Sequence, residues 1–235
     1  MFKFDDLVRN NIKKLAPYKS ARSELSEQAD IYIDANENPF NTGYNRYPDP
    51  LQTELKEKIS EIKNIPSENI FLGNGSDEII DVLMRTVCNP GIDNIITYSP
   101  SYSMYEVSAE INDVKIRKLD LANDFLPDIG KTLLLADSNT KLLFLCTPNN
   151  PTGKTIPLSM IEEFCNRFKG IVIVDEAYID FCNIASAITL LNKYPNLFVL
   201  QTLSKAYGMA GLRLGMAFAS TDIINVLNKV KPPYN

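Results

Sequence analysis

The sequence predicts an α/β fold in three layers, in which a mainly parallel β-sheet is covered by helices on both faces. From residue 70 onward, short apolar segments alternate with longer segments of helical periodicity. Segments 142–146 and 171–175 are apolar at nearly every position, which is typical of strands buried on both faces of a sheet. Of the 235 residues, 45% are hydrophobic and 23% are charged, a balance typical of globular proteins with a sizeable core.

Two helices and an irregular segment are predicted before residue 70. Residues 3–15 and 51–63 both show helical periodicity with a polar opposite face. We expect the second helix to bury one apolar face, which consists of Leu51, Leu55, Ile59 and Ile62. Between the two helices, residues 17–49 are rich in turn-forming residues and are expected to be irregular.

The sheet and its covering helices are predicted after residue 69. The strands are expected at 70–72, 94–98, 114–117, 142–146, 171–175, 197–200 and 215–219. The helices are expected at 76–85, 101–110, 157–168 and 221–231. Ser76 is the expected N-cap of the first of these helices, and the pair Pro232-Pro233 ends the last one.

Composition excludes several classes of function. The net charge of −5 argues against nucleic acid as a main partner, because phosphate backbones are bound by basic surfaces. The chain contains no histidine, which excludes Ser-His-Asp sites, histidine bases and histidine-ligated metals. Its four cysteines have no CxxC spacing and are read as reduced packing residues. With no apolar segment of membrane-spanning length and no signal peptide core, we expect a cytoplasmic protein without a membrane or metal partner.

Polar and aromatic residues follow several of the predicted strands. The carboxyl ends of parallel strands meet at one edge of a sheet, where ligands bind in open α/β proteins. We therefore expect one site, assembled from several loops, at this edge. The residues that follow the strand ends are Gly75, Ser76, Tyr102, Asn149, Asn150, Asp175, Tyr178, Ser204 and Lys205.

Lys205 and Asp175 suggest the chemistry of this site. Most lysines after a strand are solvated, but small residues and hydroxyls flank Lys205 and predict that it is partly buried. Burial lowers the pKa of a lysine and so favours the neutral amine, which is the form that makes a Schiff base with an aldehyde. Asp175 ends an apolar strand, so its carboxylate requires a cationic or hydrogen-bonding partner, and a protonated pyridine nitrogen is suitable. The alternative for Asp175 is a cap of the turn after the strand.

The remaining groups suit a phosphate and a flat ring. The turn at 73–76 opens a helix and offers backbone N–H groups to an anion, although it lacks the Lys of a Walker loop. Arg213 is suited to grip the same anion beside Ser204, and Tyr102 to stack on a ring. Each group also has a simpler interpretation as a turn, a surface ion-pair partner or a core aromatic. Taken together, they are the parts that pyridoxal phosphate (PLP) chemistry requires.

These motifs resemble the fold-type I PLP-dependent aminotransferases and, within them, the histidinol-phosphate aminotransferase family. The resemblance runs from about Tyr18 to the last residue. It rests on the segments 17–18, 34–39, 45–50, 73–78, 100–102, 149–153, 175–178, 202–205 and 211–213.

The resemblance implies a role for each residue of the site. It makes Lys205 the Schiff-base lysine that shuttles a proton, with Asp175 paired to the ring nitrogen. The residues that it places around the ring are Asn150 and Tyr178 at the ring oxygen and Tyr102 on the ring face. Those that it places at the phosphate are Gly75, Ser76, Asp77, Ser204, Arg213 and, from a second subunit, Tyr47. Tyr18 and Asn36 are implied to lie on the substrate side.

The resemblance also implies transamination between L-histidinol phosphate and 2-oxoglutarate, with glutamate as the partner amino acid, by a homodimer. Three alternatives stay open: an aromatic aminotransferase, a threonine-phosphate decarboxylase of the same fold, and a PLP-binding protein without activity. Residues 1–45 are expected to form an arm for the dimer and substrate site, residues 46–231 the PLP domain, and residues 232–235 the start of a hinge. Family members continue into a small domain that supplies an arginine for the substrate, so we expect this chain to bind PLP and to bind substrate poorly.

Overall fold

The computed structural model describes residues 2–18 and 31–234. Its centre is a seven-stranded sheet in the order β1-β7-β6-β5-β4-β2-β3. The strands are β1 Ile70–Asn74, β2 Asn94–Ser99, β3 Lys115–Asp120, β4 Thr140–Cys146, β5 Ile171–Asp175, β6 Leu197–Thr202 and β7 Leu214–Ala219. The α-helices are α1 Asn10–Lys13, α2 Thr53–Lys63, α3 Ser76–Val87, α4 Met104–Ile111, α5 Ile129–Leu135, α6 Leu158–Arg167 and α7 Thr221–Val230. The strand pairs are parallel except those of β7, which confirms the predicted mainly parallel α/β fold.

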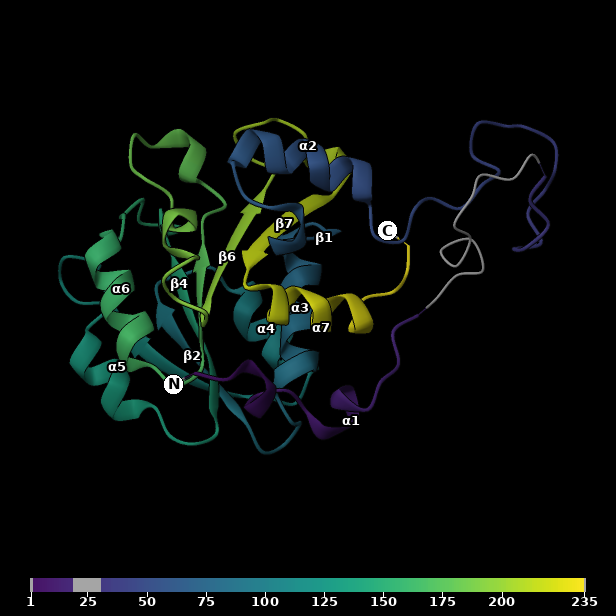
Figure 1. The fold of residues 1–235 in the computed structure, drawn as a ribbon. Helices are drawn as coiled ribbons and strands as arrows, with labels where there is room; N and C mark the ends of the chain where they lie inside the picture. Colours follow the sequence, from purple (N-terminus) through teal and green to yellow (C-terminus); the bar gives the residue numbers. More distant parts are fainter. Residues whose placement is uncertain (1, 19–30, 235) are drawn as a thin grey trace.

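Two apolar cores lie on opposite faces of the sheet and give the molecule three layers (Figure 1). Successive residues of β5 alternate between them: Ile171 and Ile173 belong to one core, and Val172 and Val174 to the other. Residues of α3, α4 and α7 complete the first core, whereas residues of α2 and α6 complete the second. Burial on both faces explains why the central strands are continuously apolar.

The antiparallel strand β7 brings its first residues to the carboxyl edge of the parallel strands. Leu214 pairs with Asn74 at the end of β1, and Gly215 pairs with Thr202 at the end of β6. The turn after β1 passes so close to β7 that a Cβ added to Gly215 would lie 2.3 Å from the carbonyl carbon of Gly75. Residues that precede β7 are therefore held beside residues that follow β1 and β6.

The helix predicted over residues 3–15 is divided in two. A 3-10 helix covers Phe4–Asp6, and α1 begins only at Asn10. Between them Arg9 has an extended ψ of 141°, and its backbone N–H donates to the carbonyl of Thr86 at 3.0 Å. This bond to the end of α3 takes the place of an intrahelical bond and interrupts the helix.

The predicted apolar face of the helix over 51–63 is not buried as a unit. Ile59 is buried against the sheet. The positions of that face that remain exposed are Leu51, Leu55 and Ile62. Gln52 has a left-handed φ of 50°, so Leu51 precedes the helix and does not continue its periodicity.

Two further differences concern helix starts. Gly75, with a φ of 80°, occupies the N-cap of α3, and Ser76 is its first helical residue, so the prediction of Ser76 as N-cap is wrong. The reason is that β1 continues to Asn74 and leaves one residue for the turn, in a conformation that favours glycine. The short helix α5 is absent from the predicted elements, because it contains Gly130 near its start.

Candidate active site

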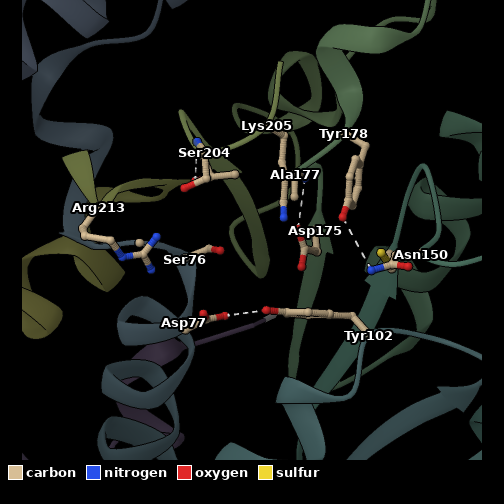
Figure 2. Close-up of a pocket in the computed structure, with 13 residues that line it drawn as sticks. Ser76, Asp77, Tyr102, Asn150, Asp175, Ala177, Tyr178, Ser204, Lys205 and Arg213 are labelled. Atoms are coloured by element: carbon tan, nitrogen blue, oxygen red, sulfur yellow. Dashed lines mark hydrogen bonds between the residues drawn. The ribbon is translucent and has the colours of Figure 1, made fainter. Parts of the chain in front are cut away.

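One pocket lies at the carboxyl edge of the parallel strands (Figure 2). The predicted site residues that line it are Gly75, Ser76, Asp77, Tyr102, Asn150, Asp175, Tyr178, Ser204, Lys205 and Arg213. They come from the ends of β1, β2, β4, β5 and β6 and from the residue before β7. The structure therefore assembles one site from loops that are far apart in the sequence.

Asp175 is the buried acid of the pocket. It is the last residue of β5 and is 3% exposed. Its Oδ1 accepts the backbone N–H of Ala177 at 3.0 Å, and its Oδ2 accepts the hydroxyl of Tyr105 at 2.6 Å. Burial raises the pKa of this carboxyl above 3.8, and the hydrogen bond from Tyr105 acts in the opposite direction. A cationic ligand atom beside Asp175 would favour its ionised form.

Lys205 and Tyr178 stand side by side above Asp175 in Figure 2. The Lys205 Nζ lies 5.5 Å from the centre of the Tyr178 ring. The Asn150 amide reaches the Tyr178 hydroxyl at 3.5 Å. An amine, a phenol and an amide from three different loops thus converge on one side of the pocket.

The prediction that Lys205 is partly buried is wrong, because its side chain is exposed. β6 is buried throughout, but it ends at Thr202, and residues 205–213 form an exposed loop beyond it. The shielding that the apolar strand gives to its own residues therefore does not extend to the lysine. The amine nevertheless points into the pocket from its open side (Figure 2).

The opposite end of the pocket is built to receive an anion. Ser76 and Asp77 form the first turn of α3, whose backbone N–H groups have no intrahelical partners. The Arg213 guanidinium and the Ser76 side chain lie beside each other in Figure 2, with Ser204 on the neighbouring loop. The Ser204 backbone N–H donates to Thr202 Oγ1 at 3.1 Å, which ties this loop to the end of β6.

Tyr102 lies between the anion end and the acid. Its hydroxyl donates to Asp77 Oδ1 at 3.1 Å, and its ring meets Tyr105 edge-on at 5.5 Å between ring centres. Burial raises the pKa of the Tyr102 phenol well above its ordinary value of 10.0, and the negative charge of Asp77 adds to this shift. Tyr102 is therefore present as a neutral hydrogen-bond donor whose ring lines the pocket.

Sequence reasoning missed several residues of the site. Cys146, Ala177 and Thr202 line the pocket, and Tyr105 contacts its acid. Tyr105 carried a weak signal, because it lies three residues after Tyr102 within the helix predicted over 101–110, although α4 begins only at Met104 and Tyr102 precedes it. Cys146 and Thr202 are the last residues of β4 and β6, where the apolar pattern of a strand indicates only membership of the sheet.

Four predicted residues lie outside the pocket. Asn149 is buried and does not line it, and its side-chain amide donates to the carbonyl of Pro100 at 3.0 Å. Tyr47 is 52% exposed and stacks on Tyr234 at 4.6 Å between ring centres. Tyr18 is exposed, and Asn36, which has a left-handed φ of 53°, does not line the pocket. The segment from 31 to 47 extends away from the sheet (Figure 1), so its residues do not reach the site of their own chain.

Residues 2–18 and 31–234 contain neither a candidate metal-binding group nor a candidate membrane-spanning helix. They contain no group of three or more His, Cys, Asp or Glu side chains that could hold a metal ion. Among the same residues, no helix has the length and apolar character needed to cross a membrane.

Comparison with known proteins identifies the family. The family described as aminotransferase class I and II matches residues 17–235. The chain is 54% identical to histidinol-phosphate aminotransferase from Parabacteroides distasonis, over 98% of this chain and 67% of that protein. It is 51% identical to the enzyme of the same name from Cytophaga hutchinsonii, over 100% of this chain and 68% of that protein. The chain therefore belongs to the class I and II aminotransferases. Within this family its sequence is similar to the histidinol-phosphate aminotransferases, of whose length it spans about two thirds.

Solved structures show the same fold. The structure of an Erwinia carotovora protein described as a histidinol-phosphate aminotransferase matches with a TM-score of 0.73 at 26% identity, over 80% of this chain and 57% of that chain. The Sinorhizobium meliloti histidinol-phosphate aminotransferase, solved with pyridoxal-5'-phosphate, matches with a TM-score of 0.74 at 23% identity, over 80% of this chain and 52% of that chain.

The pocket fits pyridoxal phosphate, the cofactor of this family. The buried Asp175 carboxylate suits a protonated ring nitrogen, and the exposed amine of Lys205 suits an aldehyde. At the anion end a Cβ on Gly75 would lie 2.5 Å from Arg213 Nη2, so the absence of a side chain keeps a cradle of backbone N–H groups and guanidinium open for a phosphate.

Proposed function

We propose that this protein transfers an amino group between L-histidinol phosphate and 2-oxoglutarate, with glutamate as the amino-acid partner and PLP as cofactor. The observation that carries the proposal is the meeting of Lys205, Asp175 and Arg213 in one pocket at the carboxyl edge of the sheet. Relatives with the name histidinol-phosphate aminotransferase, 47% to 54% identical to this chain, support the choice of substrate.

The residues of the pocket divide the work between binding and proton transfer. When bound, PLP supplies an electron-withdrawing ring that spreads the negative charge formed at the substrate Cα. Lys205 would hold the cofactor at its aldehyde, and once the substrate amine has replaced it there, its freed amine would move the proton at the substrate Cα. Asp175 holds the proton on the ring nitrogen. Asp175 ends β5, and Lys205 lies in the loop that follows β6.

The other residues position the cofactor. Asn150 and Tyr178 would donate to the ring oxygen, and Tyr102 would cover one face of the ring. The groups proposed to hold the phosphate are the backbone N–H groups of Gly75, Ser76 and Asp77, together with Ser204 and Arg213. Their positive helix end and guanidinium favour a dianion. Tyr18 and Asn36 are proposed to contact the substrate.

We further propose that the protein works as a homodimer in the cytoplasm. Residues 1–45 would form the arm that reaches the partner, residues 46–231 the cofactor domain, and residues 232–235 the beginning of a hinge. Between residue 31 and the end of α2, exposed apolar side chains support this assembly. They are Ile31, Ile33, Phe40, Tyr44, Tyr47, Leu51, Leu55 and Ile62. Exposed apolar groups in such number are typical of a surface covered by a partner.

A spectroscopic titration tests the function. The purified protein with PLP should show a visible absorption band. L-histidinol phosphate, added at concentrations high enough to offset the weak substrate binding expected of this chain, should convert the band to the absorbance of the amino form of the cofactor. Addition of 2-oxoglutarate should then restore the band. The same titration with an aromatic amino acid and with threonine phosphate provides the comparison. A response to either of these and not to histidinol phosphate would overturn the substrate assignment.

A further inference from the structure

Tyr105 is a buried tyrosine whose hydroxyl lies against the acid of the site. It belongs to α4 and is 1% exposed. Its hydroxyl is 2.6 Å from Asp175 Oδ2, and its ring stacks on Phe144 at 4.5 Å between ring centres with an interplanar angle of 19°. Since Phe144 fixes the ring, the hydroxyl has little freedom to turn away from the carboxylate.

The two oxygens of Asp175 receive donors from different elements. The backbone N–H of Ala177 binds Oδ1 at 3.0 Å, and Tyr105 binds Oδ2. Together the two bonds fix the plane of the carboxylate. A carboxylate has about four lone-pair sites, so one can still accept a proton donor from a ligand.

The charges around Asp175 show why a donor matters at this position. Burial and the negative charge of Asp77 both favour the protonated carboxyl, whereas Lys205 and the bond from Tyr105 favour the carboxylate. Cys146, on the neighbouring strand β4, also lies close to the Tyr105 hydroxyl. Burial raises the pKa of the Cys146 thiol to about 12, so it adds no charge near neutral pH.

We propose that Tyr105 is a positioning residue of this enzyme: its hydroxyl orients Asp175 and keeps it ionised, so that Asp175 can hold the cofactor ring nitrogen protonated. The inference rests on the proposed PLP chemistry and extends it by one residue that does not line the pocket. Tyr105 acts only through Asp175, and its contribution should disappear when Asp175 cannot carry a charge.

Tyr105→Phe is the direct test, because it removes the hydroxyl and keeps the ring that stacks on Phe144. PLP affinity should fall about tenfold or more, the range for a lost hydrogen bond to a charged group. The visible band of the bound cofactor should also change its pH dependence. When the ring carries less positive charge, the nitrogen that joins Lys205 to the cofactor holds its proton more strongly. The pH midpoint of the band should therefore rise by several tenths to about one unit.

Tyr98→Phe is the matched control. Tyr98 is also buried, and its hydroxyl lies 2.7 Å from Thr132 Oγ1, but its ring belongs to the core on the other face of the sheet. The control loses a buried hydrogen bond of similar geometry and should leave the PLP affinity and the pH midpoint at the wild-type values. Equal shifts in both variants would mean that the effect is general loosening, and would overturn the proposal.

A double-mutant comparison separates a role through Asp175 from an independent one. In the Asp175→Asn background, Tyr105→Phe should change PLP affinity by less than about twofold. A full loss of about tenfold in that background would refute the proposed coupling. If the wild-type protein shows no visible band with PLP, the proposed function itself fails. If the wild-type protein shows the band, and Tyr105→Phe has the same PLP affinity and the same pH midpoint, only the role of Tyr105 fails.

Discussion

The guanidinium of Arg213 occupies the space that a side chain at Gly75 would need. A Cβ at Gly75 would lie 2.5 Å from Arg213 Nη2 and 3.2 Å from its Cζ. The two residues belong to the turn after β1 and the turn before β7, which meet because β7 is antiparallel to β1. Glycine at this position therefore allows the positive φ of the turn and also leaves room for the arginine side chain.

Gly75→Ala should accordingly weaken PLP binding. Alanine at a φ of 80° costs about 1 kcal/mol of stability, and the methyl group must also displace the guanidinium from the phosphate. Gly43→Ala is the control, since Gly43 has the same φ of 80° but nothing within 4 Å of an added Cβ. PLP titration of both variants should show a loss of affinity only for Gly75→Ala. Equal affinities would show that Arg213 does not bind the phosphate from this position.

Lys205→Ala should abolish transamination and leave part of the PLP binding. The phosphate and ring contacts remain, whereas the amine that bonds to the cofactor and moves the proton is lost. In wild type, borohydride reduction followed by peptide mapping should place the cofactor on Lys205. Recovery of the label on Lys193 or Lys229 would refute the assignment.

Asp175→Asn should lower the turnover rate by several orders of magnitude and weaken PLP binding much less. An amide cannot keep the ring nitrogen protonated, and each loss of about 1.4 kcal/mol in transition-state stabilisation lowers the rate tenfold. Single-turnover kinetics at saturating PLP would separate the two effects. A variant with most of the wild-type rate would show that Asp175 is only a cap of the turn.

The pH dependence of stability provides a test in the absence of cofactor. Burial raises the pKa of Asp175 above its unfolded value of 3.8, so the folded state binds the proton more tightly than the unfolded state. The resulting contribution to the unfolding free energy is present below pH 3.8 and is lost as pH rises through the folded pKa. Asp175→Asn lacks this titration, so its stability relative to wild type should improve as pH rises, by at most about 1.4 kcal/mol for each pH unit. Urea denaturation of both cofactor-free proteins across this range measures the difference, and a constant difference would contradict the burial of an ionisable Asp175.

Mixed subunits test whether Tyr47 acts across a dimer interface. The Tyr47→Phe homodimer should lose PLP affinity by about tenfold if the hydroxyl binds the phosphate of the neighbouring subunit. When it is mixed with Lys205→Ala subunits, each site with an intact lysine receives its tyrosine from the partner and should regain wild-type affinity. A fully active monomer would rule out shared sites.

Much of the fold could be predicted because buried strands leave a strong signal in the sequence. The continuous apolar segments of β4 and β5 could be assigned without knowledge of the rest of the chain. The convergence of Asn150, Asp175 and Lys205 followed from the rule that parallel strands end at one edge.

The remaining features depend on tertiary contacts that leave no local pattern. The bond of Tyr105 to Asp175 exists because the Tyr105 side chain reaches from α4 to Phe144 of β4 and Asp175 of β5, a tertiary contact that local patterns do not describe. The exposure of Lys205 depends on the path of the loop after β6. The interruption at Arg9 comes from its hydrogen bond to the end of α3.

The position of β7 makes cofactor binding a late event in the assembly of this protein. β1 joins the sheet only through β7, so the β1 end of the β1–α3 turn is hydrogen-bonded into the sheet only when β7 lies between β1 and β6. In a chain emerging from the ribosome, the phosphate cradle would thus form after nearly all of the described residues have been synthesised. PLP would then bind chains with a completed sheet and not partly folded chains, and this binding would stabilise the folded state. The supply of PLP would therefore affect the yield of folded protein as well as its activity.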